Sequence, residues 1–172
     1  MTYWIASDQH FNHSGIINLE KRSFSNVVEM NEKIVYKYQN LVKDDDTVFF
    51  LGDFGFGQKG PLLNILSQLP GYKIFINGSH DNHRPFKSIV YCMVLEYGGE
   101  LILLQHEPPQ VTGGATMVIH GHLHTRGTHP FMDRCWTKND IPYINVCPEL
   151  WSYEPVKLET CIKIVQRWRK IQ

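Results

Sequence analysis

The sequence predicts an α/β protein in two parts, a β-α-β-α-β half followed by a strand-rich half. Short apolar runs alternate with two helical patterns as far as residue 76, and four more short apolar runs follow, separated by turn residues. Alternating strands and helices favour parallel strands whose faces are covered by helices. We therefore expect a two-part α/β sandwich.

The elements of the first half are three strands and two helices. The strands are the apolar runs 2–6, 47–51 and 72–76. A capping box of Asn26 and Glu29 begins the first helix, in which apolar residues then recur at helical spacing as far as Val42. The second helix is expected to have Pro61 at its first position and to end before Pro70. This order predicts a parallel sheet with helices on it.

The second half contains four expected strands and one helix. The strands are the apolar runs 89–95, 101–105, 116–120 and 142–146. Apolar residues at helical spacing from Cys161 to Ile171 predict a closing helix. Basic residues near its end suit the negative end of the helix dipole.

Length and charge limit the function classes. The 172 residues predict one domain, 1–172, and 17 basic residues balance 17 acidic ones. A chain without net charge has no field for coating nucleic acid, so only local nucleic-acid contact stays open. No apolar run has the length of a membrane span, and the first residues lack a signal-peptide pattern. The four cysteines are widely spaced, which favours reduced thiols over a disulfide framework. We therefore expect a cytoplasmic location.

Histidines and carboxylates gather where the expected strands end. The nine histidines fall into four groups, and none lies between Ser14 and Ser79. Polar residues that follow strands include Asp8, His10, Asp53, Ser79, His80, Asp81, His106, His120, His122 and His124. The carboxyl ends of parallel strands line the crevice where ligands bind. Mixed imidazole and carboxylate donors at that rim predict a metal site, and two adjacent ions would form a hydrolytic two-metal centre.

Two other motifs in the sequence compete with this interpretation. Residues 55–60 match a Gly-x-Gly-x-x-Gly dinucleotide motif, but the glycines do not begin at the strand end and the histidines stay unexplained. Residues 53–55 spell the kinase Asp-Phe-Gly triplet without the other kinase motifs. Both alternatives are weaker than a metal site.

Five short motifs in fixed order carry a resemblance. They are Asp8-Gln9-His10, Gly52-Asp53, Gly78-Ser79-His80-Asp81, His106 and Gly121-His122-Leu123-His124. This ordered set resembles the calcineurin-like metallophosphoesterases, and the chain looks most like their small single-domain bacterial and phage-type members. The resemblance implies a four-layer α/β/β/α sandwich of the metallo-dependent phosphatase type.

The resemblance also implies a function and a set of residue roles. Two divalent ions, with Mn²⁺ as the first choice and Fe, Zn, Ni or Mg as alternatives, would hydrolyse a phosphoester through a bridging hydroxide. One ion would be bound by Asp8, His10 and His124, the other by His106 and His122, and Asp53 would bridge them. His80 would act as an acid oriented by Asp81. The expected substrate is a phosphodiester or a phosphorylated small molecule.

Ser79 departs from the family pattern, which has an asparagine ligand of the second metal at this position. A hydroxyl is shorter and a weaker ligand than an amide oxygen, so the second site would be weaker, completed by water or vacant. This departure is what favours the alternative function, a non-catalytic scaffold or binding module with a degenerate site. Intact residues at the other ligand positions favour the enzyme.

Several further residues carry less weight. His13, His83 and His120 could line the substrate pocket or support the ligands, and His129 is read as a surface residue. Arg22 and Arg84 could contact a substrate phosphate. Trp151 and Tyr153 could stack on a base, although core packing is the expected role.

Overall fold

The first of two β-sheets is formed by the N-terminal half. The structure is a computed structural model that describes residues 1–81, 88–125 and 134–170. Strands β1 (Tyr3–Ala6), β2 (Thr47–Phe50) and β3 (Tyr72–Phe75) are parallel, as predicted, in the order β3-β2-β1. A short strand, β9 (Val156–Lys157), adds to β1 in the antiparallel direction. The C-terminal part of the chain therefore returns to the first sheet.

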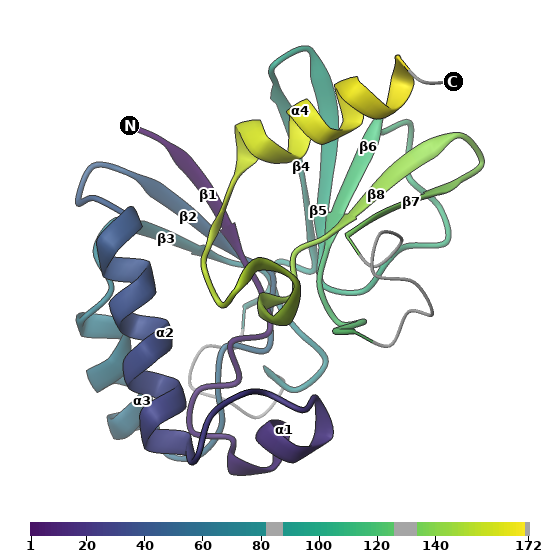
Figure 1. Ribbon diagram of the computed structural model, residues 1–172. Coiled ribbons are helices and arrows are strands. Elements are labelled where there is room, and N and C mark those ends of the chain that lie inside the picture. Colours follow the sequence, from purple (N-terminus) through teal and green to yellow (C-terminus); the bar gives the residue numbers. More distant parts are fainter. Residues whose placement is uncertain (82–87, 126–133, 171–172) are drawn as a thin grey trace.

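The second sheet has five strands in the order β4-β5-β6-β8-β7. Its strands are β4 (Cys92–Tyr97), β5 (Glu100–Gln105), β6 (Met117–His120), β7 (Cys135–Lys138) and β8 (Ile141–Asn145). The central strands β5, β6 and β8 are parallel, and each outer strand is antiparallel to its neighbour. The parallel strands of both sheets direct their carboxyl ends toward one region of the molecule (Figure 1).

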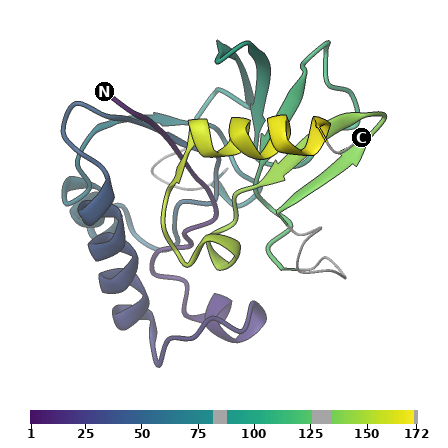
Figure 2. The same ribbon diagram turned by 45° about the horizontal axis from the view of Figure 1, so that its top comes forward.

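Helices lie on the outer face of the first sheet and at both ends of the two sheets. α2 (Val27–Leu41) and α3 (Lys59–Ser67) pack on the outer face of the first sheet, and α1 (Ser14–Leu19) lies near the carboxyl ends of the strands (Figure 1). α4 (Leu158–Arg169) crosses the side where the two sheets diverge (Figure 2). A 3-10 turn, η2 (Pro148–Trp151), follows β8. The α/β sandwich predicted from sequence is confirmed.

Alternation along the strands separates the core into layers. Trp4, Val48 and Phe50 face α2 and α3, whereas Ile5 and Phe49 face the second sheet. The inner cluster also contains residues of β5, β6, β8 and α4. The outer face of the second sheet is packed by a smaller cluster of Leu103, Ala115, Val118 and Tyr143. β1 and β2 are therefore buried on both faces, and the loops after them have a rigid support.

Several predicted boundaries need correction. Pro61 is the third residue of α3 rather than its first. Asn26 caps α2 as expected, but Glu29 accepts the backbone N–H of Ser25 instead of that of Asn26, so the capping box is displaced by one residue. The strand predicted over 89–95 begins later, at Cys92 of β4, and Ile89 is 91% exposed. Strands β7 and β9 and helix α1 were not predicted.

Among the described residues, no helix has both the length and the apolar character needed to cross a membrane.

Candidate metal centre

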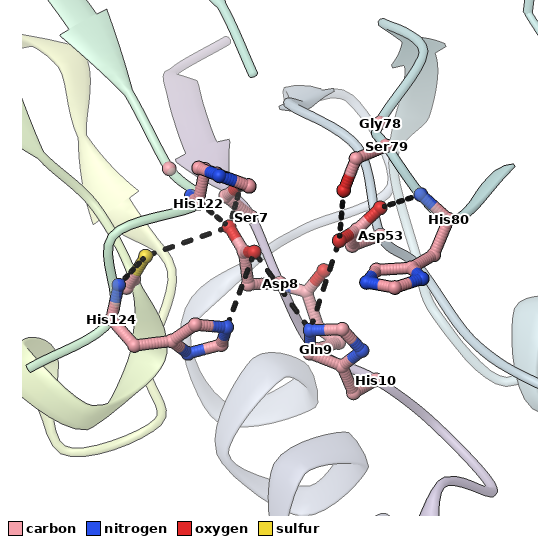
Figure 3. Close-up of polar contacts among 12 residues, drawn as sticks. Ser7, Asp8, Gln9, His10, Asp53, Gly78, Ser79, His80, His122 and His124 are labelled. Atoms are coloured by element: carbon pink, nitrogen blue, oxygen red, sulfur yellow. Dashed lines mark hydrogen bonds and ion pairs between the residues drawn. The ribbon is translucent and has the colours of Figure 1, made fainter. Parts of the chain in front are cut away.

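Loops after β1, β2, β3, β5 and β6 bring most of the predicted site residues together. Figure 3 shows Asp8, His10, Asp53, Ser79, His80, His122 and His124 around one small region between the two sheets. Nε2 of His10 lies 3.8 Å from Oδ1 of Asp8 and 3.9 Å from Oδ2 of Asp53. Nε2 of His124 lies 3.6 Å from the same Asp8 oxygen. These atoms converge, as expected of ligands around a common cation.

The two oxygens of Asp8 have different surroundings. Oδ2 accepts hydrogen bonds from the Ser7 hydroxyl and from the backbone N–H of His122, and the thiol of Cys147 lies 3.5 Å away. Oδ1 is buried and has no hydrogen-bond partner among the described residues. The donors on Oδ2 fix the orientation of the carboxylate, so Oδ1 faces His10 and His124.

Buried atoms of Asp8 and His10 suit a divalent cation. Asp8 is 0% and His10 is 2% exposed, and neither Asp8 Oδ1 nor the two ring nitrogens of His10 has a hydrogen-bond partner among the described residues. Buried polar atoms without partners destabilise a fold by about 1–3 kcal/mol each. Burial lowers the pKa of His10 to about 2, so the imidazole is neutral and its lone pair can bind a metal. The residues present therefore suit a cation.

Asp53 lies between the two expected metal sites. Its Oδ1 accepts the backbone N–H of His80 at 2.8 Å, and its Oδ2 faces His10, the Ser79 hydroxyl at 3.3 Å and Nε2 of His106 at 3.4 Å. Burial opposes ionisation, but the hydrogen bond and charge of His106 outweigh it and hold the pKa of Asp53 below its ordinary value. Oδ2 thus has the central position that a bridging ligand requires.

The second side of the centre contains His106, His122 and Ser79. Nδ1 of His106 lies 2.8 Å from the carbonyl of Leu51 and must donate to it, which directs Nε2 toward the site. Nε2 in turn lies 3.3 Å from Nδ1 of His122 and 3.4 Å from the Ser79 hydroxyl. Burial lowers the pKa of His106, but Asp53 and Asp8 outweigh burial and raise it to about 9. A cation bound here would replace the proton of His106.

The backbone around the centre is strained. Asp8, His10, Asp53, His122 and His124 all have φ between 47° and 67°, the left-handed region. Each such non-glycine residue costs about 1–2 kcal/mol. The loops also approach closely at Gly78 and Gly121, where an added Cβ would overlap Asp53 and Asp8, respectively. Strain of this kind concentrates at functional sites, where the surrounding fold holds it in place.

Asp81 supports the loop that carries Asp53. Its Oδ2 accepts the backbone N–H groups of Asp53 and Gly78, both at 2.8 Å. Burial raises the pKa of Asp81 above its ordinary value. The expected role of Asp81 in orienting the His80 ring stays a prediction.

Glu149 is a site residue that the sequence analysis missed. Its Oε1 lies 3.1 Å from Nδ1 of His124 and accepts from Nε of Arg22 at 2.8 Å. Burial opposes ionisation of Glu149, but its contacts with His124 and Arg22 lower its pKa. Glu149 follows the predicted strand 142–146, so the rule of polar residues after strand ends could have found it.

Arg22 does not face a substrate phosphate, and that suggestion was wrong. It is 4% exposed, and its guanidinium donates to the carbonyls of Asp8 and Gln9 at 2.8 Å as well as to Glu149. These acceptors hold it against the backbone of the loop after β1. Arg22 therefore supports the centre through the backbone of Asp8 and Gln9 and through Glu149.

Asp8, His124 and Cys147 form a second group with metal-ligand spacing. Cys147 is buried, accepts the backbone N–H of His124 at 3.2 Å and lies against the Oδ2 side of Asp8. Burial raises the pKa of this thiol well above its ordinary value. Cys147 thus lies beside the Asp8 oxygen that already accepts two hydrogen bonds, where its thiol can support the orientation of the carboxylate.

The remaining residues from the sequence analysis have structural surroundings or lie outside the described part. His120 is buried, donates to the carbonyl of Gly121 and accepts from Trp136, and burial lowers its pKa to about 4. His13 stacks on Phe56 at 4.0 Å between ring centroids. Trp151 and Tyr153 pack against the two main core clusters, as expected. His83, Arg84 and His129 lie outside the described residues.

An open pocket adjoins the second side of the centre. Its volume is about 250 Å³, and it is lined by Asn77, Gly78, Ser79, Tyr91, Gln105, His106 and Glu107. The pocket thus reaches Ser79 and His106 directly.

The α/β sandwich and the converging carboxylates and imidazoles together form a candidate metal centre. No protein-family model matches the chain. An uncharacterized protein of Methanocaldococcus jannaschii is 32% identical over 176 residues, covering 98% of this chain and 94% of its own. The gene 66 protein of Mycobacterium phage L5 is 31% identical over 141 residues, covering 76% and 67%, respectively.

Solved structures agree on the fold. A protein of unknown function from Aquifex aeolicus has a TM-score of 0.72 and 26% identity, covering 95% of this chain and 98% of that one. An archaeal phosphodiesterase has a TM-score of 0.50 and 18% identity, covering 92% and 99%, respectively. The chain belongs to one family with the Methanocaldococcus jannaschii protein, and its fold is that of the calcineurin-like metallophosphoesterases.

Proposed function

We propose that this protein hydrolyses a phosphoester with the help of two divalent cations. The observation that carries the proposal is a set of buried atoms on Asp8 and His10 that face Asp53 and His124 and have no hydrogen-bond partner among the described residues. A fold retained only as a scaffold has no reason to keep such destabilising atoms pointed at one place.

The residues divide into two ligand groups. Asp8, His10 and His124 would hold one cation, His106 and His122 the other, and Asp53 would contact both. Divalent cations held by these residues would activate a water molecule as nucleophile and neutralise charge on the phosphoryl oxygens. Carboxylate and imidazole donors suit Mn²⁺, with Fe, Zn, Ni and Mg as alternatives.

His80 would handle the proton of the leaving group. Its side chain is exposed beside Asp53, and its ring centroid lies 6.0 Å from that of His10 (Figure 3). Its backbone N–H is bonded to Asp53, which fixes where the side chain begins. An imidazole at this position can stabilise the transition state or protonate the departing oxygen.

The substrate is proposed to be a phosphodiester or a phosphorylated small molecule. The pocket beside Ser79 and His106 can take one substituent of such a group next to the metal ligands.

The test combines metal analysis with turnover. The purified chain, loaded with Mn²⁺, is expected to bind up to two ions and to hydrolyse bis-p-nitrophenyl phosphate or p-nitrophenyl phosphate. Asp53→Asn shows whether the turnover comes from this site. It should lower turnover by at least about a hundredfold, because both ions lose a charged ligand. A chain that binds no metal and hydrolyses neither compound would contradict the proposal and favour a binding module.

A further inference from the structure

A buried chain of contacts connects His124 to two residues far away in the sequence. Oε1 of Glu149 lies 3.1 Å from Nδ1 of His124, 2.8 Å from Nε of Arg22 and 2.7 Å from its Nη2. The side chains of Arg22 and Glu149 are 0% and 5% exposed. One carboxylate oxygen therefore serves both the histidine and the arginine.

This oxygen determines which nitrogen of His124 can bind a metal. A carboxylate oxygen only accepts, so Nδ1 must carry the hydrogen, and neutral imidazole then has its lone pair on Nε2. Nε2 is the atom that lies 3.6 Å from Oδ1 of Asp8. If the hydrogen were on Nε2 instead, it would occupy the position that a cation needs.

Arg22 connects the same oxygen to the loop that carries Asp8. Its Nη1 donates to the carbonyl of Gln9 and its Nη2 to the carbonyl of Asp8, each at 2.8 Å. Asp8 and His124 come from loops on different sheets, after β1 and β6. Arg22 and Glu149 thus fix the spacing between two ligands that no continuous segment connects.

We propose that Glu149, held by Arg22, is a positioning residue that fixes His124 as an Nε2 ligand of the first metal. The inference rests on the proposed metal centre but assigns a role that none of the five motifs contains. Partners of metal-binding histidines affect metal affinity by about 10–100-fold.

The first experiment compares Glu149→Leu with Glu149→Gln. Glutamine keeps an oxygen that can accept from His124 and Arg22, whereas leucine removes it. Calorimetric titration with Mn²⁺ should show an affinity about 10–100-fold lower for Glu149→Leu, and near that of the wild type for Glu149→Gln. Equal affinity of a folded Glu149→Leu variant would overturn the proposal, and so would an equal loss in both variants.

A spectroscopic readout needs no metal. Long-range ¹H–¹⁵N spectra of the metal-free chain should show the hydrogen of His124 on Nδ1 in the wild type and in Glu149→Gln. In Glu149→Leu the Nε2–H form should rise. An unchanged Nδ1–H form in Glu149→Leu would overturn the inference. A wild type that binds no Mn²⁺ but shows the expected tautomers would contradict only the proposed function.

A double variant separates positioning from folding. Removing Glu149 alone leaves a buried arginine charge, which is strongly destabilising. Arg22→Met combined with Glu149→Leu removes both charges, and this variant should fold and still bind Mn²⁺ about 10–100-fold more weakly. The matched control is Arg169→Met with Glu100→Leu, another arginine–glutamate pair, which contacts Thr116 and not the centre. Its Mn²⁺ affinity should equal that of the wild type. An equal loss in the control would overturn the proposal.

Discussion

The buried polar groups at the two ends of the first sheet differ in how well their hydrogen bonds are satisfied. At the amino ends of β1 and β2, the carboxylate of Asp46 is 3% exposed and accepts hydrogen bonds from Thr2 N, Trp4 Nε1 and Lys43 N. At the carboxyl ends, Asp8 and His10 have left-handed backbone angles and buried atoms that lack a hydrogen-bond partner within the described part of the chain.

The groups that stabilise the fold therefore lie at one end of the sheet, and the groups of the candidate metal centre lie at the other. Satisfied hydrogen bonds at one end contribute to folding, whereas orphaned atoms and strain at the other end oppose it. Substitutions at the two ends should therefore affect different measurements, activity and metal binding at one end and unfolding at the other.

The largest effect is expected for His80→Ala at the carboxyl ends. His80 is exposed, and its backbone bond to Asp53 does not need the side chain. Loss of the proposed proton donor should lower kcat about 100–10,000-fold, while Mn²⁺ affinity and Tm stay the same. Steady-state kinetics with p-nitrophenyl esters, calorimetry and thermal melts measure the three quantities. A parallel loss of metal affinity would show that His80 is a ligand.

A smaller effect is expected for Ser79→Asn, which supplies an amide oxygen beside His106 and Asp53. The Mn²⁺ concentration for half-maximal activity should fall about 10–100-fold, with a stronger second binding step in calorimetry. Ser67→Asn, at the end of α3, is a control that should change neither value. Unchanged titrations for Ser79→Asn would mean that the serine hydroxyl already serves as a full ligand.

The smallest effect is expected for Asp46→Asn at the amino ends, and it should appear in stability alone. An amide nitrogen would face donors now bonded to the carboxylate, so the free energy of unfolding at pH 7 should fall by about 1–3 kcal/mol. Mn²⁺ affinity should not change.

The same variant has a defined pH dependence. Burial opposes ionisation of Asp46, but hydrogen bonds from Trp4, Lys43 and Thr2 outweigh it and lower the pKa in the folded state. Its stabilising contribution is thus complete above the unfolded-state pKa of about 3.9, and it is lost as pH falls through the lower native pKa. Urea unfolding at pH 7 and pH 3 should show a smaller difference from the wild type at pH 3. An equal difference at both pH values would contradict this assignment.

The sequence predicted those parts of the molecule that depend on local pattern. The strands of the first sheet are apolar runs, and most predicted site residues follow strand ends, where they indeed gather. β9 has two residues and β7 only four, so their short patterns carried little signal. The role of Arg22 was not predictable, because its acceptor Glu149 lies 127 residues away and their pairing depends on tertiary structure.

The wide spacing of the site along the chain has a consequence for biosynthesis. Asp8, His10 and Asp53 lie in the first third of the sequence, whereas His106, His122, His124 and the supporting Glu149 come much later. Contacts between such distant segments form late in folding, and a nascent chain folds from its N-terminal part as it leaves the ribosome. The proposed ligands and the supporting Glu149 are all present only after about residue 149 has emerged, so we expect metal loading to follow translation of nearly the whole sequence.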